Sequence, residues 1–435
     1  MKQNLISISL SFFKLSKNSL KPINEENSMK SFFLQRKNWF SALSLLFLLV
    51  LSLAACSTNA SGNGSSKPPS TADAATSPIS TPSSTPTVQM GAQPCPDAVK
   101  TPASWTPFVS APPDIRVADS VSCGNLLGKP SLQAMVVARE ILGGGPVYRS
   151  IFVFDKITDP KPQLLFQVGH LLKGEAQISG YSTILTAQVD RNSSLNKGKP
   201  YAAWTTDLFR EFQWSQGTRT FVQVAFPGLF PDLTRYQAEK DQLLVNQGHQ
   251  PWKLDALSTT KLFAKALLRT PAESAVVLVS GGGVHDVDAV VHVTPSVLVG
   301  CCGPFPPIKV TLSRLEGNTS NGIWIVVGVT SEYKTITAPQ KGDRLNSPVA
   351  VTGSGSQFES QVGIVHLLDH LSTDIGHSIA MGTSGFKSGP FSVNVSYEAS
   401  FQGGAQEGIV VLYDENGGGT SLRGGVAMVK VLISK

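Results

Sequence analysis

The sequence is short of charged residues and of cysteines. Charged residues make up 15% of its 435 residues, and there are five cysteines. No two cysteines are spaced as Cys-x-x-Cys, so a thioredoxin-like redox site and a zinc ribbon have no support. No Gly-x-Ser-x-Gly sequence occurs, so the sequence gives no support for the nucleophile turn of the α/β-hydrolases. The runs of three glycines lack a following Gly-Lys-Ser/Thr and predict hairpin turns rather than phosphate-binding loops.

The net positive charge of the chain is confined to its first part. The formal net charge is +6, but residues 1–55 hold seven of the 36 Lys and Arg and two of the 30 Asp and Glu. Residues 56–435 therefore carry 29 basic and 28 acidic residues. Because the charges are balanced, there is no excess of basic residues that could bind nucleic acid, and no nucleic-acid partner is expected.

Residues 1–55 are predicted to be a signal peptide. The segment 39–55 has no charge and follows Lys30, Arg36 and Lys37. A basic head before an apolar run with a small-residue ending is typical of a secretory signal. An uncleaved anchor helix is the alternative, since the run could almost span a bilayer. Met29 would open a signal of ordinary length and is the preferred start.

The end of the apolar run decides between these alternatives. Leu53-Ala54-Ala55-Cys56 resembles the bacterial lipobox. The resemblance implies that the Cys56 thiol carries a diacylglycerol and becomes the mature N-terminus. The lipid would hold the chain at the extracytoplasmic face of the bacterial cell membrane. Its acyl chains would anchor the chain there, because each buried CH₂ contributes about 0.8 kcal/mol to membrane binding.

Residues 56–93 are expected to be a disordered tether rich in Ser, Thr and Pro. Of the 37 residues at 57–93, 28 are Ser, Thr, Pro, Ala or Gly, and only Lys67 and Asp73 are charged. Such a composition cannot form a core.

Residues 94–228 are predicted to form a β-rich meander domain, open or sandwich-like. Short runs rich in Val, Ile, Phe and Thr are separated by turn residues, and the last two, around 215–217, predict a hairpin. Blades of a β-propeller would show similar runs, but no clear repeat of about 40–50 residues is present. The runs are 132–140, 148–156, 162–169, 181–190, 208–214 and 219–226.

Residues 229–335 are predicted to form a small α+β domain. The segment 230–248 predicts a helix with Gly248 beyond its end, and Ser258 is expected to be the N-cap of a second helix over 259–268. Strands are predicted at 288–293, 308–315 and 323–331, so a helix should pack on an antiparallel sheet.

Residues 336–435 predict a β-sandwich that folds alone. Phe391, Val393 and Val395 alternate with polar residues, and further strands are predicted at 347–353, 361–369, 407–415 and 425–433. Val349 and Val351 are expected to face Phe391 from the opposite sheet.

The segments 338–362 and 389–397 resemble the immunoglobulin-like domain of bacterial spore-germination-associated lipoproteins. The resemblance implies a binding role in the cell envelope, a relation to sporulation or germination, and no catalytic residues. The matching positions are Pro339, Gly342, Asp343, Ser347, Pro348, Val349, Val351, Gly353, Phe358, Glu359, Gly389, Pro390 and Phe391.

Export would place the four later cysteines in an oxidising compartment. They allow three pairings, and Cys95–Cys123 is preferred because both residues flank the start of the first folded domain. The bridge is expected to contribute about 3–4 kcal/mol. The adjacent Cys301 and Cys302 are interpreted as two small buried thiols, with a vicinal disulfide as the alternative.

Two segments hold candidate metal ligands, although no metal or cofactor is assigned. Asp286, Asp288 and His292 would share one face of a strand, but an exposed strand start explains the same pattern. The second segment, 366–377, is interpreted as a strand and a turn because of the resemblance, with His366 on the face of Val362. Its candidate ligands are His366, Asp369, His370, Asp374 and His377.

A binding or scaffolding role is therefore predicted, rather than catalysis. Ser258 and Lys261 fit the Ser-x-x-Lys motif of penicillin-interacting enzymes, but the companion Ser-Asp-Asn and Lys-Thr-Gly motifs are absent. The expected protein is a lipid-anchored envelope lipoprotein that binds an envelope protein or a cell-wall ligand. The alternative is an exported cell-wall hydrolase with a site within 94–335.

Overall fold

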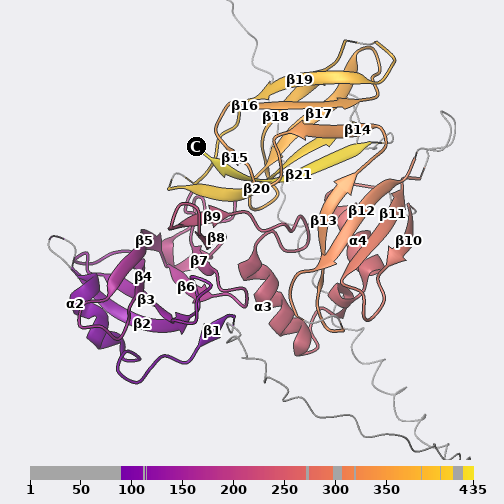
Figure 1. Cartoon of the computed structure of the whole chain (residues 1–435). Coiled ribbons are helices and arrows are strands. Elements are labelled where there is room, and N and C mark those ends of the chain that lie inside the picture. Colours follow the sequence, from indigo (N-terminus) through magenta and orange to yellow (C-terminus); the bar gives the residue numbers. More distant parts are fainter. Residues whose placement is uncertain are drawn as a thin grey trace, which may run out of the picture. The chain divides into compact units, whose positions relative to one another are not determined.

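The computed structural model describes residues 90–435 except 111–112, 114, 271–273, 297–305, 318–319, 384, 402 and 415–424. The described residues lie within one compact unit, residues 83–435. They form four sheets with a few short helices (Figure 1). The predicted fold class is confirmed: the chain is mainly β and ends in a sandwich.

The first sheet is an antiparallel meander that is buried on both faces. One face is covered by Trp105, from a 3₁₀ helix at Pro102–Trp105, and by Val109, from α2 (Thr106–Val109). Its central strand has apolar residues on both faces, so its sequence does not alternate. The strands, in sheet order, are β1 (Ala92–Gln93), β2 (Arg116–Gly124), β3 (Gln133–Glu140), β4 (Tyr148–Asp155) and β5 (Gln163–Leu172).

A second meander covers the other face of the first sheet. Met135 and Ile151 of the first sheet pack against Ile184, Phe212 and Phe221 of the second in one apolar cluster. The hairpin predicted around 215–217 joins the last two strands. The strands are β6 (Glu175–Ile178), β7 (Ile184–Gln188), β8 (Leu208–Ser215) and β9 (Thr220–Val224).

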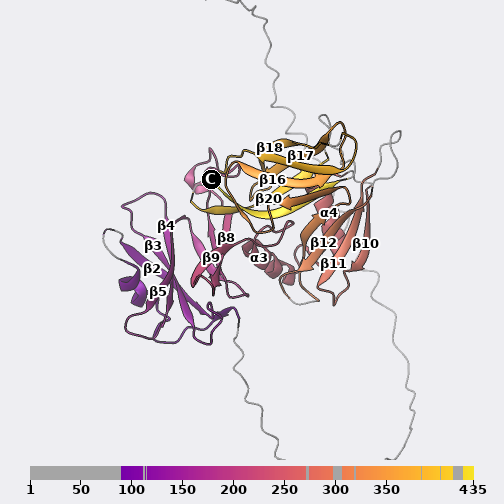
Figure 2. The same ribbon diagram turned by 45° about the horizontal axis from the view of Figure 1, so that its top comes forward.

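Two helices follow. In α3 (Arg235–Asn246), the Thr234 side chain caps the first turn, and the helix lies between the second meander and β13 (Trp324–Thr330) in Figures 1 and 2. In α4 (Ala256–Ala266) the cap is Asp255, whose carboxylate accepts from Ser258 N at 2.6 Å. Ser258 therefore lies inside the first turn, and its expected role as N-cap is wrong.

A nine-stranded sheet runs through the rest of the chain. The helix α4 packs on one part of this sheet. Val329 of β13 pairs with Met428, which lies in the last strand of the chain. The predicted domain boundary between residues 335 and 336 therefore lies inside one sheet. Its strands include β10 (Ala275–Gly281), β11 (Asp288–Thr294), β12 (Ile308–Arg314), β13, β21 (Val426–Ser434), β20 (Ala405–Tyr413), β17 (Gln361–Leu368) and β18 (Asp374–Met381), in that order, with β15 (Arg344–Leu345) beside β21.

The C-terminal sandwich closes with a three-stranded sheet. It consists of β14 (Lys334–Ala338), β16 (Val349–Gly355) and β19 (Gly389–Val395). Val349 pairs with Val395 and Val351 with Val393, so these residues share one sheet, and the expectation that they come from opposite sheets is wrong. The facing sheet contributes Val362, Val365, Leu367, Val410 and Leu412 to the common core.

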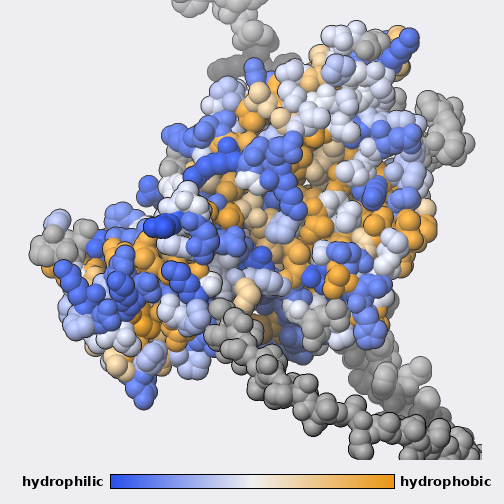
Figure 3. All heavy atoms as spheres, in the orientation of Figure 1, coloured by the Kyte–Doolittle hydropathy of each residue, from blue (hydrophilic) through white to orange (hydrophobic). Residues whose placement is uncertain are grey.

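Hydrophobic side chains reach the surface at the edge of the large sheet. In β10, Val277 and Val279 are 57% and 52% exposed, and Figure 3 shows hydrophobic residues in this region, at the right. Within the described part of the chain, no helix has the length and apolar character needed to cross a membrane.

Candidate functional site

A cavity of about 630 Å³ opens between α3 and the segment before β8. Four carboxylates and one lysine are among the residues that line it, so acidic groups dominate its charge. The ring of Tyr236, from α3, stacks on Phe209 of β8 at 4.8 Å, and its hydroxyl donates to Glu175 Oε2 at 3.1 Å. The charged lining residues are Glu175, Asp207, Asp232, Lys240 and Asp241.

Lys253 joins two of these carboxylates. It comes from a 3₁₀ helix at Pro251–Leu254 and is 1% exposed. Its Nζ donates to Asp232 Oδ1 at 3.2 Å and Oδ2 at 3.0 Å, and also to Asp241 Oδ2. Burial raises the pKa of Asp232 above its usual range, Asp241 raises it further, and Lys253 opposes the rise. The ammonium group therefore neutralises part of the negative charge at the wall of the cavity.

A second ionic cluster fixes the start of α3. Arg235 Nε donates to Glu211 Oε1 at 2.8 Å, and its Nη1 donates to Glu316 Oε1 at 2.6 Å. The guanidinium group lies 4.3 Å from the ring centre of Tyr181, in a cation–π contact. Burial and the neighbouring Glu239 raise the pKa of Glu316 to about 8, against the effect of Arg235. These contacts hold one wall of the cavity in place.

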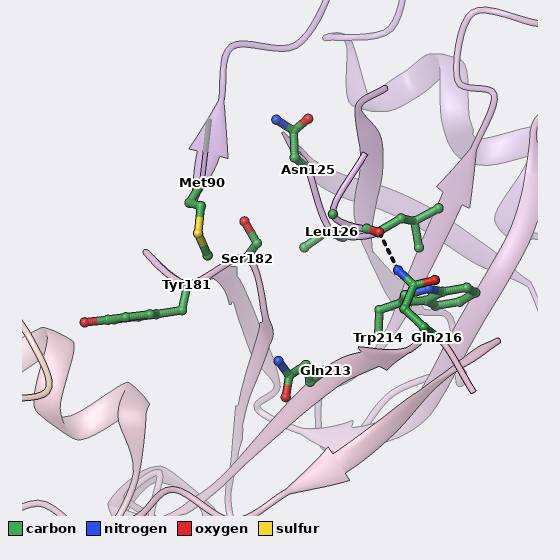
Figure 4. Close-up of a pocket in the computed structure, with 10 residues that line it drawn as sticks. Met90, Asn125, Leu126, Tyr181, Ser182, Gln213, Trp214 and Gln216 are labelled. Carbon is green, nitrogen blue, oxygen red and sulfur yellow. Dashed lines mark hydrogen bonds between the residues drawn. The ribbon is translucent and has the colours of Figure 1, made fainter. Parts of the chain in front are cut away.

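A smaller cavity of about 290 Å³ lies at the β2–β3 loop, the β6–β7 turn and β8 (Figure 4). Met90, Leu126 and Trp214 are on its walls, and Gln216 Nε2 donates to Leu127 O at 3.1 Å. None of the described residues that line it is charged. It could accept an apolar or neutral group, whereas the larger cavity is suited to a cation.

The structure brings together three of the candidate ligands in 366–377. His366 of β17 lies directly opposite His377 of β18 in the strand register, and Asp374 begins β18. Asp374 Oδ2 lies 2.8 Å from His366 Nδ1 and 3.1 Å from His377 Nδ1.

The other two candidates in this segment face elsewhere. His370 Nε2 lies 3.8 Å from Asp207 Oδ2, in the interior between the sandwich and the second meander. Asp369 accepts from Leu371 N and Thr373 N, at 2.8 and 2.9 Å, and so shapes the turn between β17 and β18.

The candidate ligands at 286–292 do not come together. Asp286 Oδ2 accepts from Gly283 N at 2.8 Å inside the β10–β11 turn. Asp288 lies opposite Ser313, and His292 lies opposite Lys309, on the neighbouring strand. Among the described residues, the three do not form a group at metal-ligand distances.

The cysteine predictions fall on both described and undescribed residues. Cys95 and Cys123 are joined as a disulfide, with their Cα atoms 5.1 Å apart, and the bond links the segment after β1 to β2. Cys56, Cys301 and Cys302 lie outside the described residues. The lipid anchor and the state of the adjacent thiols therefore stay predictions.

The acidic cavity is not among the sites that the sequence predicts. Its carboxylates come from β6, the segment before β8, the loop before α3 and α3 itself, so only the tertiary fold brings them together. Of the segments that carry these carboxylates, only the helix that contributes Asp241 and Tyr236 is predicted from the local sequence pattern.

Comparison with known proteins identifies one part of the chain. Neither the curated proteins nor the solved structures include a match to it. Residues 335–419, about a fifth of the chain, match the family described as the immunoglobulin-like domain of bacterial spore germination. This match confirms the immunoglobulin-like domain predicted from 338–362 and 389–397, and it links the C-terminal sandwich to proteins of spore germination.

Proposed function

We propose that this chain is a lipid-anchored protein on the extracytoplasmic face of a bacterial cell membrane, where it binds a component of the envelope. The observation that carries the proposal is the match of residues 335–419 to the immunoglobulin-like domain of bacterial spore germination. The apolar run that ends at Cys56 supports the anchor. A role in sporulation or germination is part of the proposal.

The acidic cavity is the proposed ligand-binding site. Its volume of about 630 Å³ is within the range of small-molecule and side-chain pockets. The exposed carboxylate of Glu175 favours a ligand with a positively charged group. The amine of an envelope protein's lysine or of a cell-wall peptide has this chemistry.

A substitution that introduces a positive charge into the cavity tests this site. Thr205 lines the cavity and is exposed, and its backbone, not its side chain, bonds with Asn196. Thr205→Arg should fill the cavity and repel a cation. Thr218→Arg is the matched control, because Thr218 is exposed in the β8–β9 turn, away from the cavity.

The measurement is a cross-linking pull-down with the full chain from detergent-solubilised membranes of the producing organism. We expect one envelope component to be captured by the wild type and by Thr218→Arg, and to be reduced at least tenfold with Thr205→Arg. Equal capture by all three proteins would show that the cavity is not the ligand-binding site. Capture of no envelope component by the wild type would reject the binding role.

The described residues provide no observation that favours the alternative of a cell-wall hydrolase. Two of the carboxylates in the cavity, Asp232 and Asp241, bind the buried Lys253. This contact accounts for their position without a reacting substrate.

A further inference from the structure

We propose that His366, Asp374 and His377 form a binding site for a divalent transition-metal cation of the zinc type. Each side chain offers one ligand atom, an imidazole nitrogen or a carboxylate oxygen, and these three atoms all lie within 4.8 Å of one another. The site is on the β17–β18 pair of the immunoglobulin-like sandwich, and it goes beyond the proposed envelope-binding role.

The set of donor atoms determines the class of metal. Two imidazole nitrogens and one carboxylate oxygen suit Zn²⁺, Cu²⁺ or Ni²⁺. Ca²⁺ and Mg²⁺ take oxygen ligands, usually six or more, and do not match a site dominated by imidazole. Three protein ligands leave one position of a tetrahedral zinc ion for water or for a donor from another molecule.

The distances are close to those that such an ion needs. Zinc–nitrogen bonds of about 2.0–2.1 Å in a tetrahedron place neighbouring ligand atoms about 3.3 Å apart. The two nitrogen–oxygen distances here are 2.8 and 3.1 Å. A small rotation of His377, whose side chain is 63% exposed, would open the group enough for the ion.

The surroundings hold two of the ligands in position. The His366 side chain is only 11% exposed, and its ring lies 5.5 Å from the ring of Tyr413. The Tyr413 hydroxyl donates to Leu267 O at 2.6 Å, which fixes that ring. Asp374 Oδ1 accepts from Gly376 N at 3.1 Å, so the other oxygen stays directed at the imidazoles. Contacts of this kind to metal ligands orient them and raise affinity.

The site is also accessible to ions in solution. His377 and Asp374 are exposed on β18, with 63% and 32% of their side chains accessible, while His366 forms the inner wall. An ion can therefore enter from the His377 side without the sandwich opening.

Zn²⁺ alone is the probe for the test, in competition with a chromophoric chelator. The sample is the full chain in detergent, with free thiols alkylated under non-reducing conditions so that Cys301 and Cys302 cannot bind the metal. We expect one Zn²⁺ per chain, at least tenfold weaker binding in His377→Ala and in Asp374→Asn, and no displacement by equimolar Mg²⁺. X-ray absorption of the zinc-loaded wild type should show two imidazole ligands.

His249→Ala is the matched control, because His249 is also exposed but lies in the loop after α3. It should bind Zn²⁺ as the wild type does. Since the His377 side chain is mostly exposed, His377→Ala should keep the circular dichroism spectrum and melting temperature of the metal-free wild type. Dissociation constants above about 1 mM, unchanged binding in His377→Ala, or equal weakening in His249→Ala would each overturn the proposal.

Discussion

Glu407 and Lys430 form an ion pair in the interior of the protein, with Glu407 Oε2 3.5 Å from Lys430 Nζ and both side chains 1% exposed. Glu407 Oε1 also accepts from Phe226 N at 3.0 Å, and Lys430 donates to Leu233 O at 2.6 Å. The pair therefore ties β20 and β21 of the sandwich to the segment between β9 and α3.

Removing one partner of this pair should be strongly destabilising. Lys430→Met leaves Glu407 buried without its countercharge, and we expect a loss of about 3–5 kcal/mol in the free energy of unfolding. The double variant Glu407→Gln/Lys430→Met should recover much of that loss, because no charge is then buried. Urea unfolding measures both changes. A cost below about 1 kcal/mol for Lys430→Met would contradict the structural role of the pair.

Two buried carboxyl groups should make the protein less stable at alkaline pH. Burial raises the pKa of Glu407 to about 7 and that of Glu316 to about 8, from 4.5. Each group binds a proton more tightly in the folded state than in the unfolded state. The resulting stability is fully present below pH 4.5 and is lost as the pH rises through 7 to 8.

The melting temperature should therefore fall between pH 5 and pH 8.5. Glu316→Gln should make this fall smaller, whereas Glu332→Gln, at an exposed position, should leave it unchanged. A melting temperature that rises over this range, or an identical pH profile for Glu316→Gln, would show that the buried carboxyl groups do not behave as described.

The Cys95–Cys123 bond should stabilise the first meander. It closes a loop with a sequence separation of 28, for which the chain-entropy argument gives about 3–4 kcal/mol. Cys123→Ser should lose roughly this amount in urea unfolding under non-reducing conditions. Thiol labelling of the denatured, non-reduced wild type should modify neither cysteine, and labelling of both would disprove the bridge.

The C-terminal sandwich should need its neighbour in order to fold. Residues 336–435 alone would expose an apolar face that includes Val411, Val426 and Met428, which share a core with Phe263 of α4. We expect this fragment to bind a hydrophobic dye and to show no cooperative melting, whereas the fragment 225–435 should melt cooperatively. A sharp transition in 336–435, with no dye binding, would restore the expectation from sequence that it folds alone.

Local patterns were enough to predict many of the strands. The alternation around Phe391 and the run of Ile, Phe and Val in β4 both correspond to strands of the structure. The strand β10 has a Val-rich sequence and was not predicted, although its composition contained the signal. In β18, a glycine and a histidine interrupt the apolar pattern, so little in its composition marks it as a strand.

Long-range pairing could not be predicted in the same way. Val329 and Met428 are about 100 positions apart, and neither residue carries a signal for the other. The contact of His366 with His377 depends on the register of β17 and β18, which includes irregular positions. Lys430 gave a weak clue, since a charged residue inside the apolar strand β21 indicates a buried partner, but its partner Glu407 follows only from the fold.

The most direct test of the account is the mass spectrum of the N-terminal peptide of this protein, purified from the membranes of its host. We expect the peptide to begin at Cys56 with a diacylglycerol on its thiol, and we expect Cys56→Ala to incorporate no labelled palmitate. An unmodified Cys56 within an uncleaved N-terminal segment, or labelled palmitate in Cys56→Ala, would contradict the proposed lipid-anchored envelope protein.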